Sequence, residues 1–159
     1  IIITIKMKVV QFMEIERKYL VSRLPGDLDG YPCRMIEQGY LNTAPVVRIR
    51  RDNEKYELTY KSEGHMVREE YNLPLTEEAY EHLLTKIDGR IITKKRYMIP
   101  YDDSLTIELD IFEGSLAPLR LAEVEFPDEA SASAFTPPDW FGEDVTFSGS
   151  YHNSALSRL

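Results

Sequence analysis

The sequence predicts an α+β fold dominated by one antiparallel β-sheet with a few helices, which would hold a small ligand if the sheet closes into a barrel of roughly eight strands. Two observations support this prediction. Short segments of alternating apolar and polar residues follow one another along most of the chain, whereas helical periodicity is rare. Within these segments the charged residues fall on one face, which would become the interior of the closed barrel.

Seven segments alternate as half-buried strands do, and an eighth, residues 38–41, does so more weakly. The seven cover residues 14–21, 46–51, 56–62, 67–73, 91–99, 105–112 and 119–126. Gly64 lies within residues 62–65, which predicts a hairpin turn between two of these strands. Residues 101–104 contain two aspartates and a serine and predict a second turn.

Three segments predict helices. In the best-defined one, Thr76 is suited to cap the N-terminus, apolar residues recur at helical spacing as far as Ile87, and Gly89 would close the helix. Residues 128–135 predict a second, short helix, and residues 150–159 predict a last one.

The composition excludes several classes of protein. With 19 Lys and Arg against 27 Asp and Glu, the net charge is −8, which argues against a nucleic-acid partner or a membrane surface. The single cysteine, Cys33, excludes a disulfide framework and a cysteine-based zinc cluster. A lone cysteine of this kind is expected to be a buried structural thiol.

The chain is interpreted as a single domain over residues 13–159, with residues 1–12 a leader or residues left from expression. The apolar stretch at the start, residues 1–5, is far shorter than the ~20 residues of a membrane-spanning helix. It is not followed by a small-residue cleavage site either, so we expect a cytoplasmic location.

The charged positions of the predicted strands form two sets of six. The bases are Lys18, Arg48, Arg50, Lys61, Lys94 and Arg96, and the acids are Glu14, Glu16, Glu108, Asp110, Glu123 and Glu125. A half-exposed sheet with its charged face in water is the ordinary explanation of such alternation. Here, however, like charges repeat along single strands, which is unfavourable unless a counter-charge lies between them.

Bases and acids in one cavity favour a complex of a divalent metal with a polyphosphate. Arg matches phosphate oxygens bidentately and Lys adds a point charge. Carboxylates without His or Cys suit hard cations, Mg²⁺ or Mn²⁺. The sequence has neither a glycine-rich phosphate loop nor a Gly-x-Ser-x-Gly elbow, so a P-loop ATPase or a serine hydrolase is not supported.

Residues 14–18, Glu-Ile-Glu-Arg-Lys, resemble the Glu-x-Glu-x-Lys signature of the CYTH superfamily, the triphosphate tunnel metalloenzymes. The later charged strands resemble this family in residue type and order, as far as residues 122–126, and residues 151–153 resemble its C-terminal Tyr-x-Asn segment. The resemblance implies a tunnel of eight antiparallel strands that binds a triphosphate with divalent metal. The short chain looks most like the bacterial inorganic triphosphatases.

The resemblance also implies roles for particular residues. The implied metal ligands are Glu14, Glu16, Glu108, Asp110, Glu123 and Glu125. The implied phosphate-binding residues are Lys18, Arg48, Arg50, Lys61, Glu70, Lys94 and Arg96. The implied catalytic residues are Glu14, Glu16, Lys18, Glu123 and Glu125. Two points stay open. Glu70 either orients the bases or helps to position water, or it only pairs with Arg68. The attacking water is activated either by a metal ion that lowers its pKa or by Glu123 or Glu125, which would take its proton.

The expected reaction is the metal-dependent hydrolysis of a triphosphate, with inorganic tripolyphosphate favoured, to phosphate and diphosphate. The expected cofactor is Mg²⁺ or Mn²⁺, and the expected partner is a small-molecule triphosphate, with no nucleic acid and no membrane. Three alternatives remain: a class IV-type adenylyl cyclase, a thiamine triphosphatase, and a non-catalytic module that binds polyphosphate or nucleotide.

Overall fold

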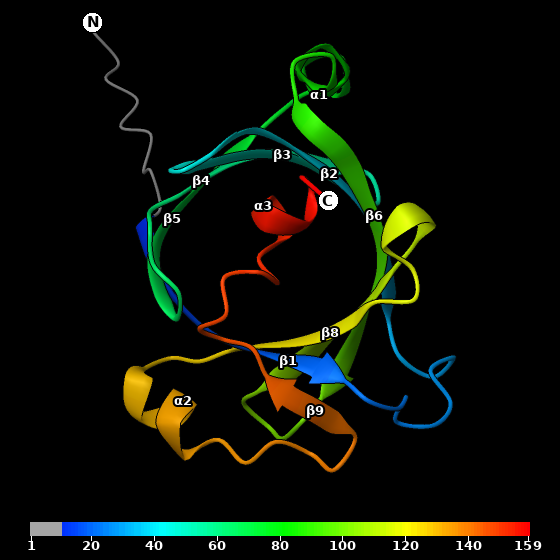
Figure 1. Ribbon diagram of the computed structural model, residues 1–159, viewed down its shortest axis with the longest axis vertical. Helices are drawn as coiled ribbons and strands as arrows, with labels where there is room; N and C mark the ends of the chain where they lie inside the picture. Colours follow the sequence, from blue (N-terminus) through cyan, green and yellow to red (C-terminus); the bar gives the residue numbers. More distant parts are fainter. Residues whose placement is uncertain (1–10) are drawn as a thin grey trace, which may run out of the picture.

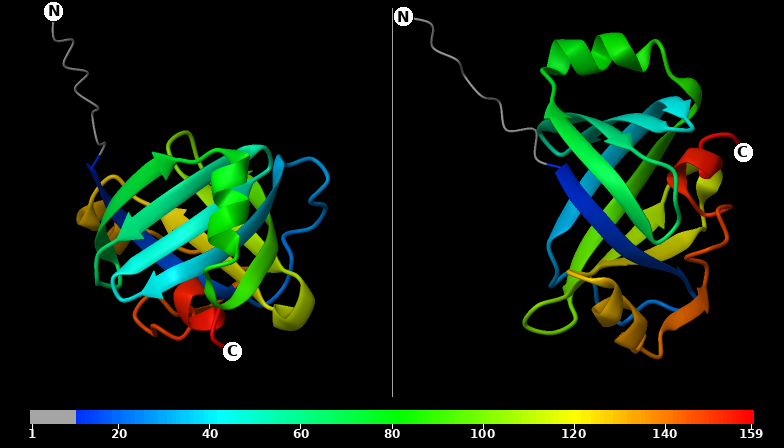
Figure 2. Two further views of the ribbon diagram at one scale, coloured as in Figure 1. Left: turned by 90° about the horizontal axis from the view of Figure 1, so that it is seen from above. Right: turned by 90° about the vertical axis from the view of Figure 1, so that its left-hand side faces the viewer.

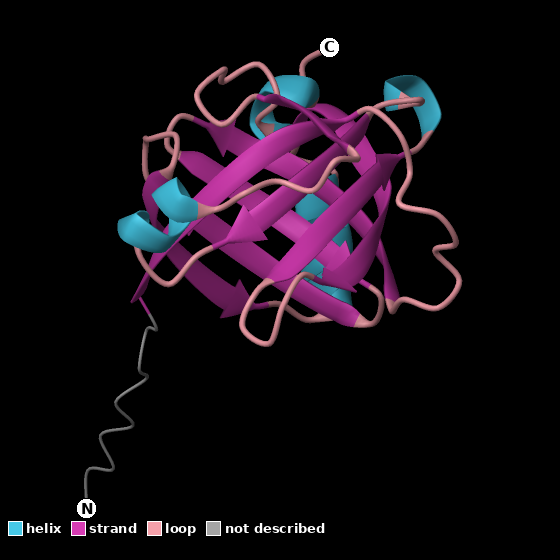
Figure 3. Cartoon of the chain, turned by 90° about the horizontal axis from the view of Figure 1, so that it is seen from below, coloured by secondary structure: helices cyan, strands magenta, loops and turns pink. Residues whose placement is uncertain are grey.

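A computed structural model describes residues 11–159. The interpretation of residues 1–12 as a leader therefore lies outside the described residues, except for its last two positions. Strands make up most of the described chain, and the helices are short (Figure 3). No helix in this part of the chain is long and apolar enough to span a membrane.

Eight antiparallel strands close into a barrel, as the sequence predicts (Figure 1). The barrel strands are β1 (Gln11–Val21), β2 (Cys33–Thr43), β3 (Val46–Asp52), β4 (Lys55–Lys61), β5 (Val67–Pro74), β6 (Asp88–Pro100), β7 (Thr106–Phe112) and β8 (Arg120–Glu125), and a further short strand is β9 (Phe141–Asp144). Their order is β5-β4-β3-β2-β6-β7-β8-β1, and the first half of β1 closes the ring by pairing with β5. The short β9 adds to the second half of β1, outside the ring.

β2 is much longer than the predicted strand over residues 38–41. In the first half of β2, polar Arg34 and Gln38 point into the barrel while apolar Met35 is exposed. The sequence of this half therefore lacks the alternation of apolar and polar residues from which a strand is predicted. Cys33 is the first residue of this strand and is exposed, so the prediction that it is buried is wrong. β9 was not predicted, because three of its four residues are exposed and they carry no periodic signal.

The helices are α1 (Glu77–Leu84), α2 (Glu129–Ala134) and α3 (Asn153–Leu156), with a 3₁₀ turn, η1, at Gly114–Leu116. Thr76 caps α1 as predicted, because its hydroxyl accepts a hydrogen bond from Ala79 N. The prediction that Gly89 closes this helix is wrong, since α1 ends at Leu84 and Gly89 belongs to β6. The chain from Asp88 onward pairs with β2 instead of continuing the helix. Ile87, just before β6, packs over Gly39 of β2, where a Cβ added to Gly39 would lie 2.7 Å from Ile87 Cγ2.

Both predicted turns are present. Gly64 has a φ of 137° in the connection between β4 and β5. Asp102 Oδ1 accepts hydrogen bonds from Ser104 N at 2.8 Å and Leu105 N at 2.7 Å, which holds the turn between β6 and β7. The last helix, α3, is shorter than the predicted residues 150–159.

The apolar face of the barrel points outward on β1, β7 and β8 and is covered by α2 and the segment that leads to β9 (Figure 1). The buried cluster there is Ile15, Tyr19, Ile99, Ile107, Leu109, Ala122, Val124, Phe126, Ala132, Phe135, Trp140 and Phe141. This burial outside the ring leaves the interior to the charged residues. The barrel is therefore inverted relative to an ordinary small barrel, whose apolar side chains fill the inside.

α3 closes one end of the barrel. It lies within the ring of strands in the end-on view of Figure 1 and at one end of the strands in the right-hand view of Figure 2. Leu156 of α3 packs in a buried cluster with Tyr40, Phe112 and Leu121, among others. At the opposite end of β8 from Leu121, Glu125 is exposed, so the interior reaches solvent at that end.

Candidate functional site

A cavity of about 140 Å³ inside the barrel is lined entirely by polar and charged residues. They are Glu14, Glu16, Lys18, Arg34, Arg48, Arg50, Lys61, Glu70, Arg96, Glu108, Glu123, Glu125 and Asn153. Every residue that the sequence assigns to the site is in this set except Lys94 and Asp110. Side chains two apart on a strand share a face, which is why the alternation brings residues from eight strands, β1 to β8, into one cavity.

Lys94 and Asp110 do not line this cavity, although they share the strand parity of Arg96 and Glu108, and both are fully buried. Lys94 Nζ donates hydrogen bonds to Asp110 and, at 3.3 Å, to Asn153 Oδ1. Burial lowers the pKa of Lys94 to about 8, against the opposing effect of Asp110. Asp110 also accepts from Arg96 Nε at 2.6 Å, so its carboxylate is occupied by two bases and fixes their positions.

Glu123 lies between two bases at the centre of the cavity. Lys18 Nζ is 2.7 Å from Glu123 Oε1, and Arg96 Nη2 is 2.5 Å from Glu123 Oε2. Although burial opposes it, these two charges hold the pKa of Glu123 well below its usual range. Glu123 is therefore ionised at neutral pH.

Glu14 and Glu70 share Lys61 between them. Lys61 Nζ lies 2.5 Å from Glu14 Oε1 and 2.8 Å from Glu70 Oε2, and Arg68 Nη2 is 3.3 Å from Glu14 Oε2. Burial, reinforced by Glu16, raises the pKa of Glu14 to about 7. For Glu70, Lys61 outweighs burial and lowers the pKa to about 2. Arg68 thus pairs with Glu14, whereas Glu70 orients Lys61.

Arg48 and Arg50 on β3 are held by uncharged groups. Arg50 donates to Gln38 Oε1 from Nε at 3.0 Å and from Nη2 at 2.9 Å. Arg48 Nη2 donates to Thr59 Oγ1 at 2.9 Å, while its buried Nε has no hydrogen-bond partner among the described residues. Burial and the neighbouring cations Arg48 and Arg96 lower the pKa of Arg50 to about 10, so it remains charged at neutral pH.

Carboxylates are in excess at the open end. Burial and the charges of Glu108, Glu70 and Glu16 raise the pKa of Glu125. In residues 11–159 no three acidic, histidine or cysteine side chains already form a group that could hold a metal ion. The hard oxygens of Glu16, Glu108 and Glu125 nevertheless fit a cation such as Mg²⁺, which takes only one or two protein carboxylates when phosphate oxygens complete its shell.

Some residues of the site have no counterpart in the sequence prediction. Arg34, Gln38, Thr59 and Asn72 were not assigned, and Asn153 was noted only within the C-terminal segment of the resemblance. Arg34 and Gln38 share their strand parity with Tyr40, so a correct assignment of β2 would have placed both inward. Thr59 has the parity of Lys61, but an uncharged residue there carries no signal of its own.

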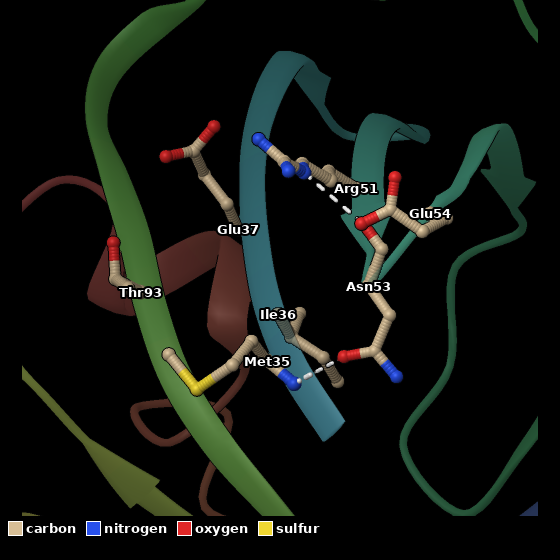
Figure 4. A pocket seen from close by; sticks show the side chains of 7 residues that line it. All are labelled: Met35, Ile36, Glu37, Arg51, Asn53, Glu54 and Thr93. Atoms are coloured by element: carbon tan, nitrogen blue, oxygen red, sulfur yellow. Dashed lines mark hydrogen bonds between the residues drawn. The ribbon is translucent and has the colours of Figure 1, made fainter. Parts of the chain in front are cut away.

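A second pocket, of about 440 Å³, lies on the outer wall of β2, β3 and β6 (Figure 4). Two of its polar groups already have hydrogen-bond partners within the pocket, because Arg51 Nε donates to Asn53 O and Met35 N donates to Asn53 Oδ1. Arg51 is exposed there, as its parity predicts. The pocket lacks the dense charge of the interior and contains none of the residues assigned from the sequence to the site.

A barrel with apolar side chains outside and charged side chains inside is the structure of a class of tunnel-shaped proteins that can bind an anion and a cation together. Residues 13–158 match the family described as CYTH domain. This chain belongs to the CYTH domain family, in agreement with the resemblance found in the sequence.

Two relatives of this chain have the same name, inorganic triphosphatase. An inorganic triphosphatase of Nitrosomonas europaea is 44% identical over 148 residues, which cover 91% of this chain and 96% of that protein. An inorganic triphosphatase of Acetivibrio thermocellus is 36% identical, covering 91% and 93% respectively. A crystal structure of an inorganic triphosphatase superposes with a TM-score of 0.70 at 39% identity, covering 93% of this chain and 96% of that one.

Proposed function

We propose that this chain is a divalent-metal-dependent inorganic triphosphatase, which hydrolyses tripolyphosphate to phosphate and diphosphate inside its barrel. The observation that carries the proposal is the charge arrangement of the cavity. Among residues 11–159, two arginines on β3 have no carboxylate partner at ion-pair distance, while carboxylates are in excess at the open end. An anion and a metal ion would each relieve one of these imbalances. The names of the two relatives support the same substrate.

In this proposal the bases bind the phosphoryl groups. Arg48 and Arg50 contribute charge held by uncharged groups, and Lys18, Lys61 and Arg96 contribute charge that their carboxylates already hold in place. Phosphoryl transfer depends mainly on positioning and on stabilising charge on the phosphoryl oxygens. A rigid set of donors whose positions are fixed by ion pairs suits that requirement.

Glu16, Glu108 and Glu125 would hold the metal ion together with phosphate oxygens. When bound, such an ion neutralises phosphate charge and lowers the pKa of a coordinated water. Glu123 is the poorer candidate to accept the water's proton, because Lys18 and Arg96 hold its pKa well below the usual range and make it a weak base.

Substituted triphosphates are the second candidate substrates. The cavity of about 140 Å³ is below the ~300–1,000 Å³ usual for organic ligands, so a nucleoside or thiamine group would lie outside it. A pocket of about 470 Å³ at the open end shares Glu108 and Glu125 with the cavity and also includes Leu105 and Phe126. This pocket could receive such a group.

The proposal is tested by measuring phosphate release from tripolyphosphate, thiamine triphosphate and ATP, each with Mg²⁺, Mn²⁺ or EDTA. We expect release that requires metal and is fastest on tripolyphosphate. Formation of diphosphate from ATP without phosphate release would favour a cyclase instead. Binding of tripolyphosphate without turnover of any substrate would contradict the proposal and favour a non-catalytic module.

A further inference from the structure

The cations of the tunnel differ in how their charge is balanced. Lys18, Lys61, Lys94 and Arg96 each contact at least one carboxylate, and Arg34 and Arg68 pair with Asp52 and Glu14. Within the described part of the chain, Arg48 and Arg50 have no carboxylate oxygen within ion-pair distance, 4.0 Å. Both lie on β3, so one wall of the tunnel carries two positive charges that form no direct ion pair with a described carboxylate.

Gln38 supports Arg50 from the neighbouring strand. The two residues are direct partners in the pairing of β2 with β3, and Gln38 is fully buried. Its Oε1 accepts both hydrogen bonds from Arg50, and its Nε2 donates to Tyr40 Oη at 3.1 Å. A guanidinium can only donate, so these contacts fix the amide orientation. The amide oxygen thus orients Arg50 as a carboxylate would, but leaves its charge intact.

Thr59 supports Arg48 in the same way from β4. Its hydroxyl accepts from Arg48 Nη2 at 2.9 Å and donates to Asn72 Oδ1 at 2.7 Å, and Thr59 is fully buried. Arg48 is itself 5% exposed and retains the unpartnered Nε. A buried donor without a partner is costly unless a ligand completes it, so this atom independently indicates an anion at the β3 wall.

We propose that Gln38 and Thr59 are positioning residues that set the affinity for the substrate's phosphate, by orienting Arg50 and Arg48 without neutralising them. This inference rests on the proposed function and goes one step further, because it identifies uncharged side chains as determinants of anion binding. A carboxylate at either position would hold the arginine equally well and would compete with phosphate for its charge.

The decisive comparison is Gln38→Glu against Gln38→Met, with the dissociation constant of tripolyphosphate measured by calorimetry and KM and kcat measured in parallel. Glu has the shape of Gln and can accept both hydrogen bonds, whereas Met has a similar length but no acceptor and no charge. We expect Gln38→Glu to weaken binding roughly tenfold or more, and to weaken it more than Gln38→Met does. The loss should appear mainly in KM.

A purely structural role of Gln38 predicts the opposite order. In that case Gln38→Glu would bind tripolyphosphate like the wild type, and Gln38→Met would be the weaker variant, which would overturn the inference. Absence of both binding and hydrolysis in the wild-type protein would instead refute the proposed function itself. The two failures are therefore distinguishable.

Thr59 provides a second test that does not depend on the folding of the Gln38 variants. Thr59→Ser retains the hydroxyl and should bind tripolyphosphate within about twofold of the wild type. Thr59→Val has nearly the same shape without the hydroxyl, and should weaken binding roughly fivefold or more through loss of the bond that orients Arg48. Equal affinities of the Ser and Val variants would contradict the role assigned to Thr59.

Discussion

Arg50 and Arg51 are adjacent in the sequence but lie on opposite sides of the barrel wall. Arg50 lines the cavity and is bonded to Gln38, whereas Arg51 is exposed and its guanidinium lies over the ring of Tyr56, 5.9 Å from the centroid. The two residues therefore provide a matched pair, with the same chemistry one position apart and only one of them inside the tunnel.

We expect Arg50→Ala to lower kcat/KM for tripolyphosphate roughly 10²-fold or more, because the proposed function assigns this buried charge to phosphate binding. Arg51→Ala should leave kcat/KM within about twofold. The measurement is steady-state phosphate release, with circular dichroism to show that both variants are folded. Similar losses in the two variants would mean that the interior position of Arg50 has no special role.

At the scale of single residues, the sequence predicted which charged side chains point into the barrel, but not which side chains form hydrogen bonds with them. Strand parity alone placed Glu16, Arg50 and Glu123 in one interior, because a period of two is fixed by backbone geometry. It could not predict that Gln38 rather than a carboxylate would hold Arg50. That choice depends on the register between two strands and involves a side chain that carries no charge.

The element that differs most from its sequence prediction is the C-terminal segment after β9. Val145 N donates to Lys18 O at 2.9 Å, and Lys18 N donates to Thr146 Oγ1 at 3.0 Å, so this segment lies against β1. The ring of His152, at the start of α3, lies 5.5 Å from that of His65 between β4 and β5. These contacts span distant parts of the chain, and no local periodicity could predict them.

His152 should make the stability of the fold depend on pH. Burial, with the charges of Lys18 and Arg68, lowers the pKa of His152 from 6.5 to about 4. Between these values the unfolded chain binds a proton that the folded protein does not, so the free energy of unfolding falls as the pH drops from 6.5 to 4. We expect His152→Gln to remove a contribution on the order of 1 kcal/mol, after allowance for screening by solvent.

The check is urea unfolding at several pH values between 4 and 7. The difference in unfolding free energy between His152→Gln and the wild type should change in favour of the variant as the pH falls. His82→Gln, at an exposed position of α1, is the control and should run parallel to the wild type. A constant difference for His152→Gln across this range would contradict the effect assigned to His152.

At the scale of the whole molecule, closure of the sheet is what converts a charged strand face into a binding cavity. Alternation predicted the strands, and the repeated like charges indicated that their polar face was enclosed. The closing pair of β1 with β5 joins residues between 52 (Ile15 with Val67) and 60 (Gln11 with Tyr71) positions apart, and α3, which closes one end of the barrel, lies further still along the chain. The barrel was therefore predictable as a class, whereas its closed end was visible only in the structure.

The net charge of −8 opposes the approach of an anion, which would have to reach Arg48 and Arg50 inside an acidic protein. In the proposed function, an anion that enters at the open end would pass Glu108 and Glu125. Association of the substrate with metal beforehand would reduce the repulsion there, because the complex carries less negative charge. Substrate capture and metal binding are thus expected to be coupled at this end.

The most direct test of the account is a crystal structure of the protein with Mn²⁺ and a non-hydrolysable imido analogue of tripolyphosphate. We expect the analogue inside the barrel, with phosphoryl oxygens on Arg48 and Arg50, and an anomalous Mn²⁺ signal beside Glu108 and Glu125. An analogue bound outside the barrel, or a metal away from these carboxylates, would contradict the claim that the charged interior is the active site.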